Sequence, residues 1–114
     1  MSPDNSSPEK APWITSRPEL KVLDCTVRDG GLINDHRFSD GFVRAVYDTC
    51  IGAGLDTMEI GYKNSERLFP RDRFGAWRHC REEDMRRVVG DHDAEGTGLT
   101  LAAMADAGKS DWQT

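Results

Sequence analysis

The sequence lacks long hydrophobic runs, an excess of basic residues and closely spaced cysteines. Its apolar runs are far shorter than the roughly 20 residues that cross a membrane, and Met1–Pro12 is too polar for a signal peptide. The formal net charge is -5 over 114 residues, whereas a general nucleic-acid-binding protein needs a basic surface. We therefore expect no membrane partner and no nucleic-acid partner.

Cysteine is scarce as well. Cys25, Cys50 and Cys80 are far apart in the sequence, they are odd in number, and no C-x-x-C spacing occurs. This pattern argues against a disulfide framework and against a zinc site built on paired cysteines. We expect three reduced thiols and a cytoplasmic location.

The length suits one domain of modest size, preceded by a polar arm. Residues 1–18 contain four of the five prolines. They offer too little apolar surface to become ordered by burial. We predict a flexible arm over residues 1–18 and a folded unit over residues 19–114.

Apolar periodicity after the arm predicts strands that alternate with helices. Period-two or continuous apolar segments favour strands, which we expect over Leu20–Val27, Leu55–Ile60 and Leu99–Ala105. Three- and four-residue spacing favours helices, which we expect over Gly41–Ile51, with Ser39 or Asp40 as N-cap, and over Arg81–Val89. A helix between two strands gives parallel pairing, so the sequence predicts an α/β fold with a parallel sheet.

The first predicted strand ends in a charged corner. Arg28 and Asp29 follow its apolar residues, and Gly30 and Gly31 come directly after them. Two residues without a Cβ favour a tight turn. A cation and a carboxylate at this corner suit a metal ion or an anionic substrate. The alternative is an ordinary ion pair that caps a surface turn.

Glu59 lies near the end of the second predicted strand. A carboxylate there is costly unless it is paired, hydrogen-bonded or metal-bound. Parallel neighbours bring their C-terminal ends to one edge of the sheet, where ligands bind in α/β folds. We therefore expect Arg28, Asp29 and Glu59 to gather there. The alternative for Glu59 is a structural ion pair with Arg28.

Two later loops are rich in charge. The loop over residues 63–79 suits a lid or a binding surface for an anionic substrate or partner, and its alternative is an ordinary solvated excursion. Its basic residues are Lys63, Arg67, Arg71, Arg73, Arg78 and His79. The loop Asp91–Gly98 contains an Asp-His-Asp triplet, which favours an ordinary turn, with metal binding as the weaker alternative.

The segment LDCTVRDGG, followed about thirty residues later by LDTMEIGY, resembles the DRE-TIM metallolyases. This superfamily includes hydroxymethylglutaryl-CoA lyase and 4-hydroxy-2-oxovalerate aldolase. The resemblance extends from about Leu20 to Lys109. It implies a (β/α)8 TIM barrel, of which this chain supplies the first three parallel strands and two helices. It also implies a divalent-metal enzyme that makes or breaks a carbon–carbon bond beside a carbonyl.

The resemblance implies roles for three residues. Asp29 is expected to be a metal ligand, Arg28 to hold an enolate oxygen, and Glu59 to support Arg28 and the metal-bound water. A cation and a Lewis acid both stabilise an enolate where its charge develops. Mg2+ or Mn2+ suits such oxygen ligands, with Zn2+ or Co2+ as alternatives.

The sequence departs from this superfamily in its histidines. None of His36, His79 and His92 forms the His-x-His metal pair, and the position of the aldolases' histidine base is Leu32, with His36 as a substitute in the same loop. We therefore expect the N-terminal subunit of a split aldolase, lyase or synthase that acts on a small carbonyl or carboxylate substrate. A partner polypeptide is expected to supply the remaining barrel and the His-x-His motif. The alternatives are a non-catalytic docking or regulatory subunit and a truncated remnant of an aldolase.

Overall fold

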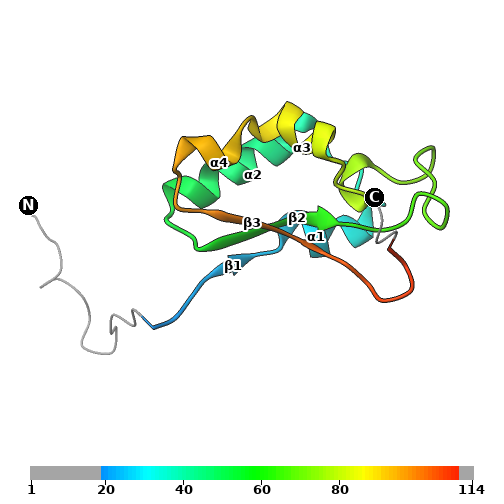
Figure 1. Cartoon of the computed structure of the whole chain (residues 1–114), viewed down its shortest axis with the longest axis horizontal. Helices are drawn as coiled ribbons and strands as arrows, with labels where there is room; N and C mark the ends of the chain where they lie inside the picture. Colours follow the sequence, from blue (N-terminus) through cyan, green and yellow to red (C-terminus); the bar gives the residue numbers. More distant parts are fainter. Residues whose placement is uncertain (1–18, 111–114) are drawn as a thin grey trace, which may run out of the picture.

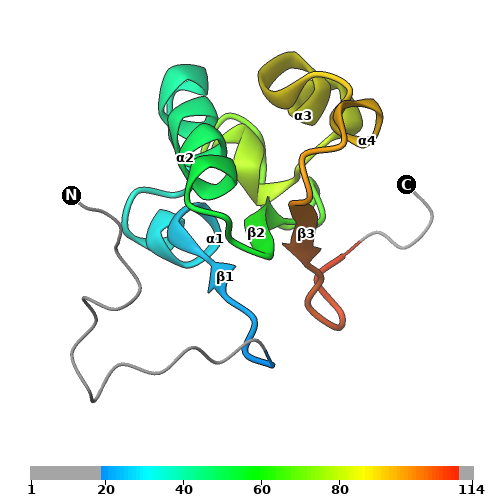
Figure 2. The same cartoon turned by 90° about the vertical axis from the view of Figure 1, so that its left-hand side faces the viewer.

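The computed structural model describes residues 19–110, which form a small parallel sheet with helices packed on one face (Figures 1 and 2). The strands are β1 (Leu23–Asp24), β2 (Thr57–Tyr62) and β3 (Thr100–Met104). The helices are α1 (Thr26–Gly30), α2 (Asp40–Gly52), α3 (Glu82–Val89) and α4 (His92–Glu95), and the 3-10 turns are η2 (Gly31–Ile33) and η3 (Ala76–Arg78). The predicted arm over residues 1–18 and the last four residues lie outside the described range.

The strands follow the order β1-β2-β3, and both pairings are parallel. Leu23 lies opposite Thr57, and Thr57 lies opposite Thr100. The prediction of an α/β fold with a parallel sheet is confirmed. Helices α2, α3 and α4 lie on one side of this sheet, while no described helix covers the other side (Figure 2).

Strand β2 contains a bulge. Glu59 pairs with Ala102 and Gly61 pairs with Ala103, so Ile60 is the extra residue between them. Gly61 has a packing role here, because a Cβ at this position would overlap the carbonyl of Trp77. Turn η3 therefore lies directly against the end of β2.

The first strand is much shorter than predicted. The expectation of strand structure as far as Val27 is wrong, because the chain turns into α1 after Asp24. The Asp24 carboxylate accepts hydrogen bonds from the Thr26 hydroxyl at 2.6 Å and from the Thr26 amide at 3.2 Å. Such local side-chain bonds compete with strand pairing. Val27 still reaches the core, but from a helix.

Helix α2 agrees with its prediction. The Ser39 hydroxyl accepts a hydrogen bond from the Phe42 amide at 3.1 Å, which confirms Ser39 as the N-cap. Val43, Tyr47 and Cys50 are the buried residues of its apolar stripe. These side chains pack with residues of β2 and α3 in one hydrophobic core.

Helix α3 also forms where the sequence predicts it, with Val88 and Val89 buried. The following segment differs, since the predicted loop Asp91–Gly98 contains the short helix α4. His92 explains this difference. Its Nδ1 accepts a hydrogen bond from the Tyr47 hydroxyl at 2.6 Å, and its Nε2 donates to the Leu99 carbonyl at 2.7 Å. The imidazole thus ties α4 to α2 and to the start of β3.

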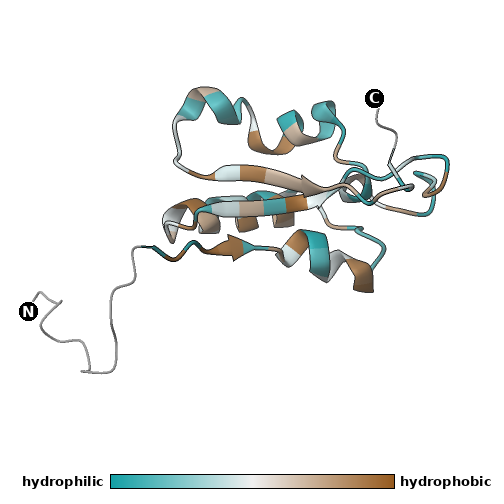
Figure 3. Cartoon of the chain, turned by 60° about the horizontal axis from the view of Figure 1, so that its bottom comes forward, coloured by the Kyte–Doolittle hydropathy of each residue, from teal (hydrophilic) through white to brown (hydrophobic). Residues whose placement is uncertain are grey.

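The β1 edge of the sheet is apolar and open (Figure 3). Leu20, Val22 and Leu23 are 60%, 55% and 50% exposed. In residues 19–110, no strand pairs with the outer edge of β1 or of β3. No helix in this range is long and apolar enough to cross a bilayer.

Candidate functional site

Arg28 and Glu59 form an ion pair at the carboxyl end of the sheet. Arg28 lies on α1, directly after β1, and its Nε donates a hydrogen bond to Glu59 Oε1 on β2 at 2.8 Å. The two side chains are only 21% and 14% exposed. The structure therefore brings together two of the residues that the sequence singles out, although they are 31 positions apart.

Asp29 lies beside this pair but is open to solvent. Its carboxylate is 3.7 Å from Arg28 Nη1, and its side chain is 62% exposed. A loosely held, exposed carboxylate retains oxygen lone pairs for a ligand. Asp29 is therefore the accessible carboxylate of the group, while Glu59 is occupied by Arg28.

The strand pleat explains the position of Glu59. Met58 and Ile60 are buried in the core under the helices, so Glu59 between them points to the face that no described helix covers. Arg28 satisfies the carboxylate there. This arrangement agrees both with a supporting role for Glu59 and with the alternative of a purely structural pair.

Arg28 is held firmly as a cation. The hydrogen bond to Glu59 raises the pKa of Arg28, burial opposes this, and a hydrogen bond with Tyr62 adds to the increase. A guanidinium has five N–H donors, and Glu59 accepts from Nε. The group therefore keeps further donors for an oxygen atom of a substrate.

His36 is buried behind Arg28. It is 0% exposed, and its Nε2 donates to the Arg28 carbonyl oxygen at 2.8 Å. Burial lowers the pKa of His36, which favours the neutral ring. The hypothesis that His36 replaces the aldolase base is wrong for this structure, because one ring nitrogen is bonded to the backbone and the other is buried.

The two glycines after Asp29 do not form the tight turn that the sequence predicts. Gly30 and Gly31 have φ values of -61° and -66°, so they continue a helical path instead of forming a tight turn. A Cβ on Gly31 would overlap the ring of His36, whereas a Cβ on Gly30 would meet nothing within 4 Å. Gly31 is required by the close approach of His36.

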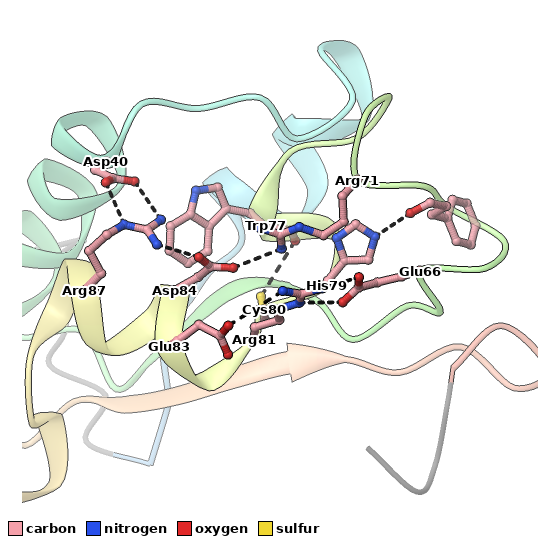
Figure 4. A network of polar contacts seen from close by, with 11 residues as sticks. Asp40, Glu66, Arg71, Trp77, His79, Cys80, Arg81, Glu83, Asp84 and Arg87 are labelled. Atoms are coloured by element: carbon pink, nitrogen blue, oxygen red, sulfur yellow. Dashed lines mark hydrogen bonds and ion pairs between the residues drawn. The ribbon is translucent and has the colours of Figure 1, made fainter.

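The basic loop over residues 63–79 is fastened to the helices by ion pairs (Figure 4). Arg71 Nη1 donates to Asp84 Oδ2 at 3.0 Å, and Arg87 Nη1 donates to Asp84 Oδ1 at 2.5 Å. Arg87 also pairs with Asp40 of α2 at 2.9 Å. Just beyond the loop, Arg81 pairs with Glu66. Two of the loop's charged residues, Arg71 and Glu66, therefore attach it to α3 and to the residue before that helix.

Asp84 is the buried centre of this network, with its side chain 5% exposed. Burial alone would raise the pKa of Asp84, but the hydrogen bonds from Arg87 and Arg71 outweigh burial and hold that pKa below its usual range. Asp84 is one of three acidic residues in the first turn of α3, a position that suits the helix dipole. Its link to Arg71, 13 residues away, has no local sequence signal.

The other two histidines are hydrogen-bonded within the fold, and Cys50 and Cys80 are buried. His79 Nε2 donates to the Phe69 carbonyl at 2.5 Å, and His92 is bonded through both nitrogens. The three cysteines are free thiols, and burial raises the pKa of Cys80 to about 12. Among residues 19–110, no group of three or more His, Cys, Asp or Glu side chains is placed to hold a metal ion, and the Asp-His-Asp triplet is no exception.

Comparisons with known proteins give no relative for this chain. No protein-family model, no curated protein and no solved structure matches it. The functional argument therefore depends on the geometry of Arg28, Asp29 and Glu59 and on the sequence motifs that contain them.

Proposed function

We propose that this chain is the N-terminal part of a divalent-metal-dependent aldolase or lyase, which makes or breaks a carbon–carbon bond through an enolate. The observation that carries this proposal is the Arg28–Glu59 ion pair beside the exposed carboxylate of Asp29, at the carboxyl edge of two parallel strands. Ligands bind at this edge in parallel α/β folds. The resemblance of the two motifs to DRE-TIM metallolyases supports the same assignment.

The proposal includes a (β/α)8 barrel completed by a partner polypeptide. Parallel strands with helices on one face are consistent with the first part of such a barrel. Two grooves lie between the helices and the sheet, one beside β3 and the other beside β1, and the proposal assigns neighbouring barrel helices to them. One of about 450 Å³ lies between α3 and β3, with Met85, Val89 and Leu101 in its lining. The other, of about 260 Å³, includes Val46 and Leu55.

Arg28 is the residue proposed to act on the substrate. Enolate formation moves negative charge onto the carbonyl oxygen, and a fixed cation placed at that oxygen stabilises the charge as it develops. Glu59 holds Nε of Arg28, which leaves the remaining N–H donors for that oxygen. The preorganised ion pair therefore fits a role in transition-state stabilisation better than a mobile surface arginine would.

The described residues do not complete a metal site by themselves. Asp29 offers an accessible carboxylate, Glu59 is engaged by Arg28, and no third donor lies with them in the described part of the chain. In this proposal Asp29 is one ligand, and the His-x-His pair comes from the partner polypeptide. Oxygen ligands favour Mg2+ or Mn2+, with Zn2+ or Co2+ as alternatives.

The test is to isolate the tagged chain from its source cells, measure the native mass and quantify bound metal. The proposal predicts a heteromer with a protein of roughly 200 residues that contains His-x-His, with about one divalent ion per pair. A metal-free monomer would contradict it.

A docking or regulatory subunit is the second candidate. It is favoured by the mutual satisfaction of Arg28 and Glu59, which also suits a structural ion pair. The same isolation experiment separates the two candidates. A partner with its own complete set of Arg-Asp, Glu and His-x-His residues would indicate docking.

A further inference from the structure

Arg78 is held in an aromatic cage at the end of the sheet. Its guanidinium carbon lies 4.2 Å from the ring centroid of Phe69, 4.8 Å from that of Tyr62 and 5.4 Å from that of Phe74. Its Nε donates to Asn64 Oδ1 at 2.8 Å. The rings and the amide fix the cation in one place, and the side chain stays half-buried.

This cation has no carboxylate partner among residues 19–110. The neighbouring arginines Arg71 and Arg81 pair with Asp84 and Glu66, whereas no carboxylate in the described range lies within 4.0 Å of Arg78. A half-buried charge without a counter-ion is unfavourable. Arg78 therefore lacks a counter-ion in the described part of the chain.

Asn64 supplies a second, independent sign of a missing partner. The residue is 5% exposed, and its Nδ2 has no hydrogen-bond partner. Because Nδ2 and Oδ1 are bonded to the same carbon, this unused donor lies beside the guanidinium that Oδ1 binds. A buried donor without an acceptor is rare and needs an explanation.

Tyr62 connects this pair to the candidate active site. One side of the connection is the cation–π contact with Arg78, and the other is Arg28, whose pKa Tyr62 helps to raise. Arg78 and Arg28 are thus separated by a single tyrosine at the carboxyl end of β2. A small ligand that binds Arg28 through a carbonyl oxygen has a second cation within reach.

We propose that Arg78 and Asn64 form an oxyanion-binding subsite for the carboxylate or phosphate group of a small organic ligand. The acceptor oxygens of such a group match the free N–H donors of the guanidinium and the unused amide donor. The assignment of this ligand as the substrate rests on the proposed function, while the subsite itself does not.

The sharpest test is Asn64→Asp, which places a carboxylate where Arg78 already binds an oxygen. If the subsite lacks an anion, this isosteric change neutralises Arg78, removes the unused donor, raises the melting temperature and weakens anion binding. The Asn64→Asp variant avoids any change to the aromatic cage. A matched control is Arg73→Gln, because Arg73 is an exposed arginine of the same loop.

Binding is measured on the full chain by following the Arg78 Nε–H resonance during titration with succinate and with inorganic phosphate, at ionic strength held constant with sodium chloride. We expect saturable shifts in the wild type, a loss of affinity of at least about tenfold in Asn64→Asp, and less than a twofold change in Arg73→Gln. The anion that saturates at the lower concentration identifies the ligand group.

Two results would overturn the subsite: no saturable shift in the wild type with either anion, or equal affinity in the wild type and Asn64→Asp. Neither measurement depends on bound metal, on the partner polypeptide or on enzymatic turnover. Failure of this inference is therefore distinguishable from failure of the proposed lyase function, which is tested through Asp29 and the partner polypeptide.

Discussion

His36 Nε2 donates a hydrogen bond to the carbonyl oxygen of Arg28 across eight residues, at 2.8 Å. The ring also stands edge-on to Tyr62, with centroids 5.3 Å apart. His36 therefore contacts both the backbone that carries Arg28 and the aromatic side chain of Tyr62, which helps to raise the pKa of Arg28.

Replacement of His36 tests this relationship. We expect His36→Ala to lower the free energy of unfolding by about 2–4 kcal/mol, because it removes a buried side chain and its hydrogen bond. The Nε–H resonance of Arg28 should also lose its protection from solvent exchange. Val43→Ala, a core change away from Arg28, provides the comparison. Equal protection of Arg28 in the two variants would show that His36 only adds stability.

Gly31 and Gly30 form a matched pair for a second prediction. Gly31→Ala places a methyl group into the His36 ring, and we expect a loss of about 1–3 kcal/mol from overpacking. Gly30→Ala meets open space at a helical φ, so it should be neutral or stabilise by up to about 1 kcal/mol. Chemical denaturation of both variants measures the difference, and equal effects would contradict the packing argument.

Acid should destabilise the protein in two stages. Burial lowers the pKa of His36 and of His79 below 6.5, so the unfolded chain binds protons first and stability falls as pH decreases below about 6.5. The pKa of Asp84 is lowered below 3.8, so its contribution is lost only in more acidic solution. Urea denaturation from pH 7.5 to pH 3 measures both stages.

His79→Gln supplies the control for the first stage. It should reduce the slope of stability between pH 6.5 and the lowered histidine pKa values, and it should leave the more acidic stage in place. An unchanged slope in the first stage would mean that His79 does not contribute to it.

Asp84 and Glu82 offer a comparison of a buried with an exposed carboxylate. Asp84→Asn leaves Arg71 and Arg87 without their buried partner, so we expect a loss of about 3 kcal/mol. Glu82→Gln breaks an exposed pair with Arg86 on the same helix and should cost less than about 0.5 kcal/mol. Thermal unfolding compares the two, and similar melting temperatures would contradict a central role for Asp84.

Asp29→Asn tests the proposed metal ligand in the assembled complex. We expect the variant to assemble with the partner polypeptide but to lose bound divalent metal and at least about 100-fold of the activity. Asp72→Asn, an exposed aspartate in the basic loop, is the control. Metal analysis and native mass on the same samples give the result, and full metal content in Asp29→Asn would remove Asp29 from the site.

Strand order and periodicity predicted much of this arrangement. Parallel pairing follows from the strand–helix–strand pattern, and it places Arg28 and Glu59 at one edge without any knowledge of their contact. The helical turn that carries Arg28 was missed, because Val27 has the same apolar character in a strand as in a buried helix. The side-chain bonds of Asp24 decide between the two.

Contacts between distant loops could not be predicted in the same way. The His36 pocket requires Gly75, where a Cβ would overlap the His36 carbonyl, and these residues meet only after the loop over residues 63–79 is in place. The buried position of Asp84 likewise depends on Arg71 from that loop. Periodicity describes the faces of single elements, whereas these contacts depend on how loops close over them.

The extra residue in β2 changes the face of the sheet on which the side chains after it lie. In a regular strand, Glu59 and Tyr62 would point to opposite faces, since they are an odd number of positions apart. The bulge at Ile60 shifts Tyr62 into register with Met104 while Glu59 stays opposite Ala102, and this places both side chains on the same face. If the same residues paired without this bulge, Tyr62 would turn away from the face that carries Glu59 and Arg28, and the two cationic centres on either side of this tyrosine would be separated.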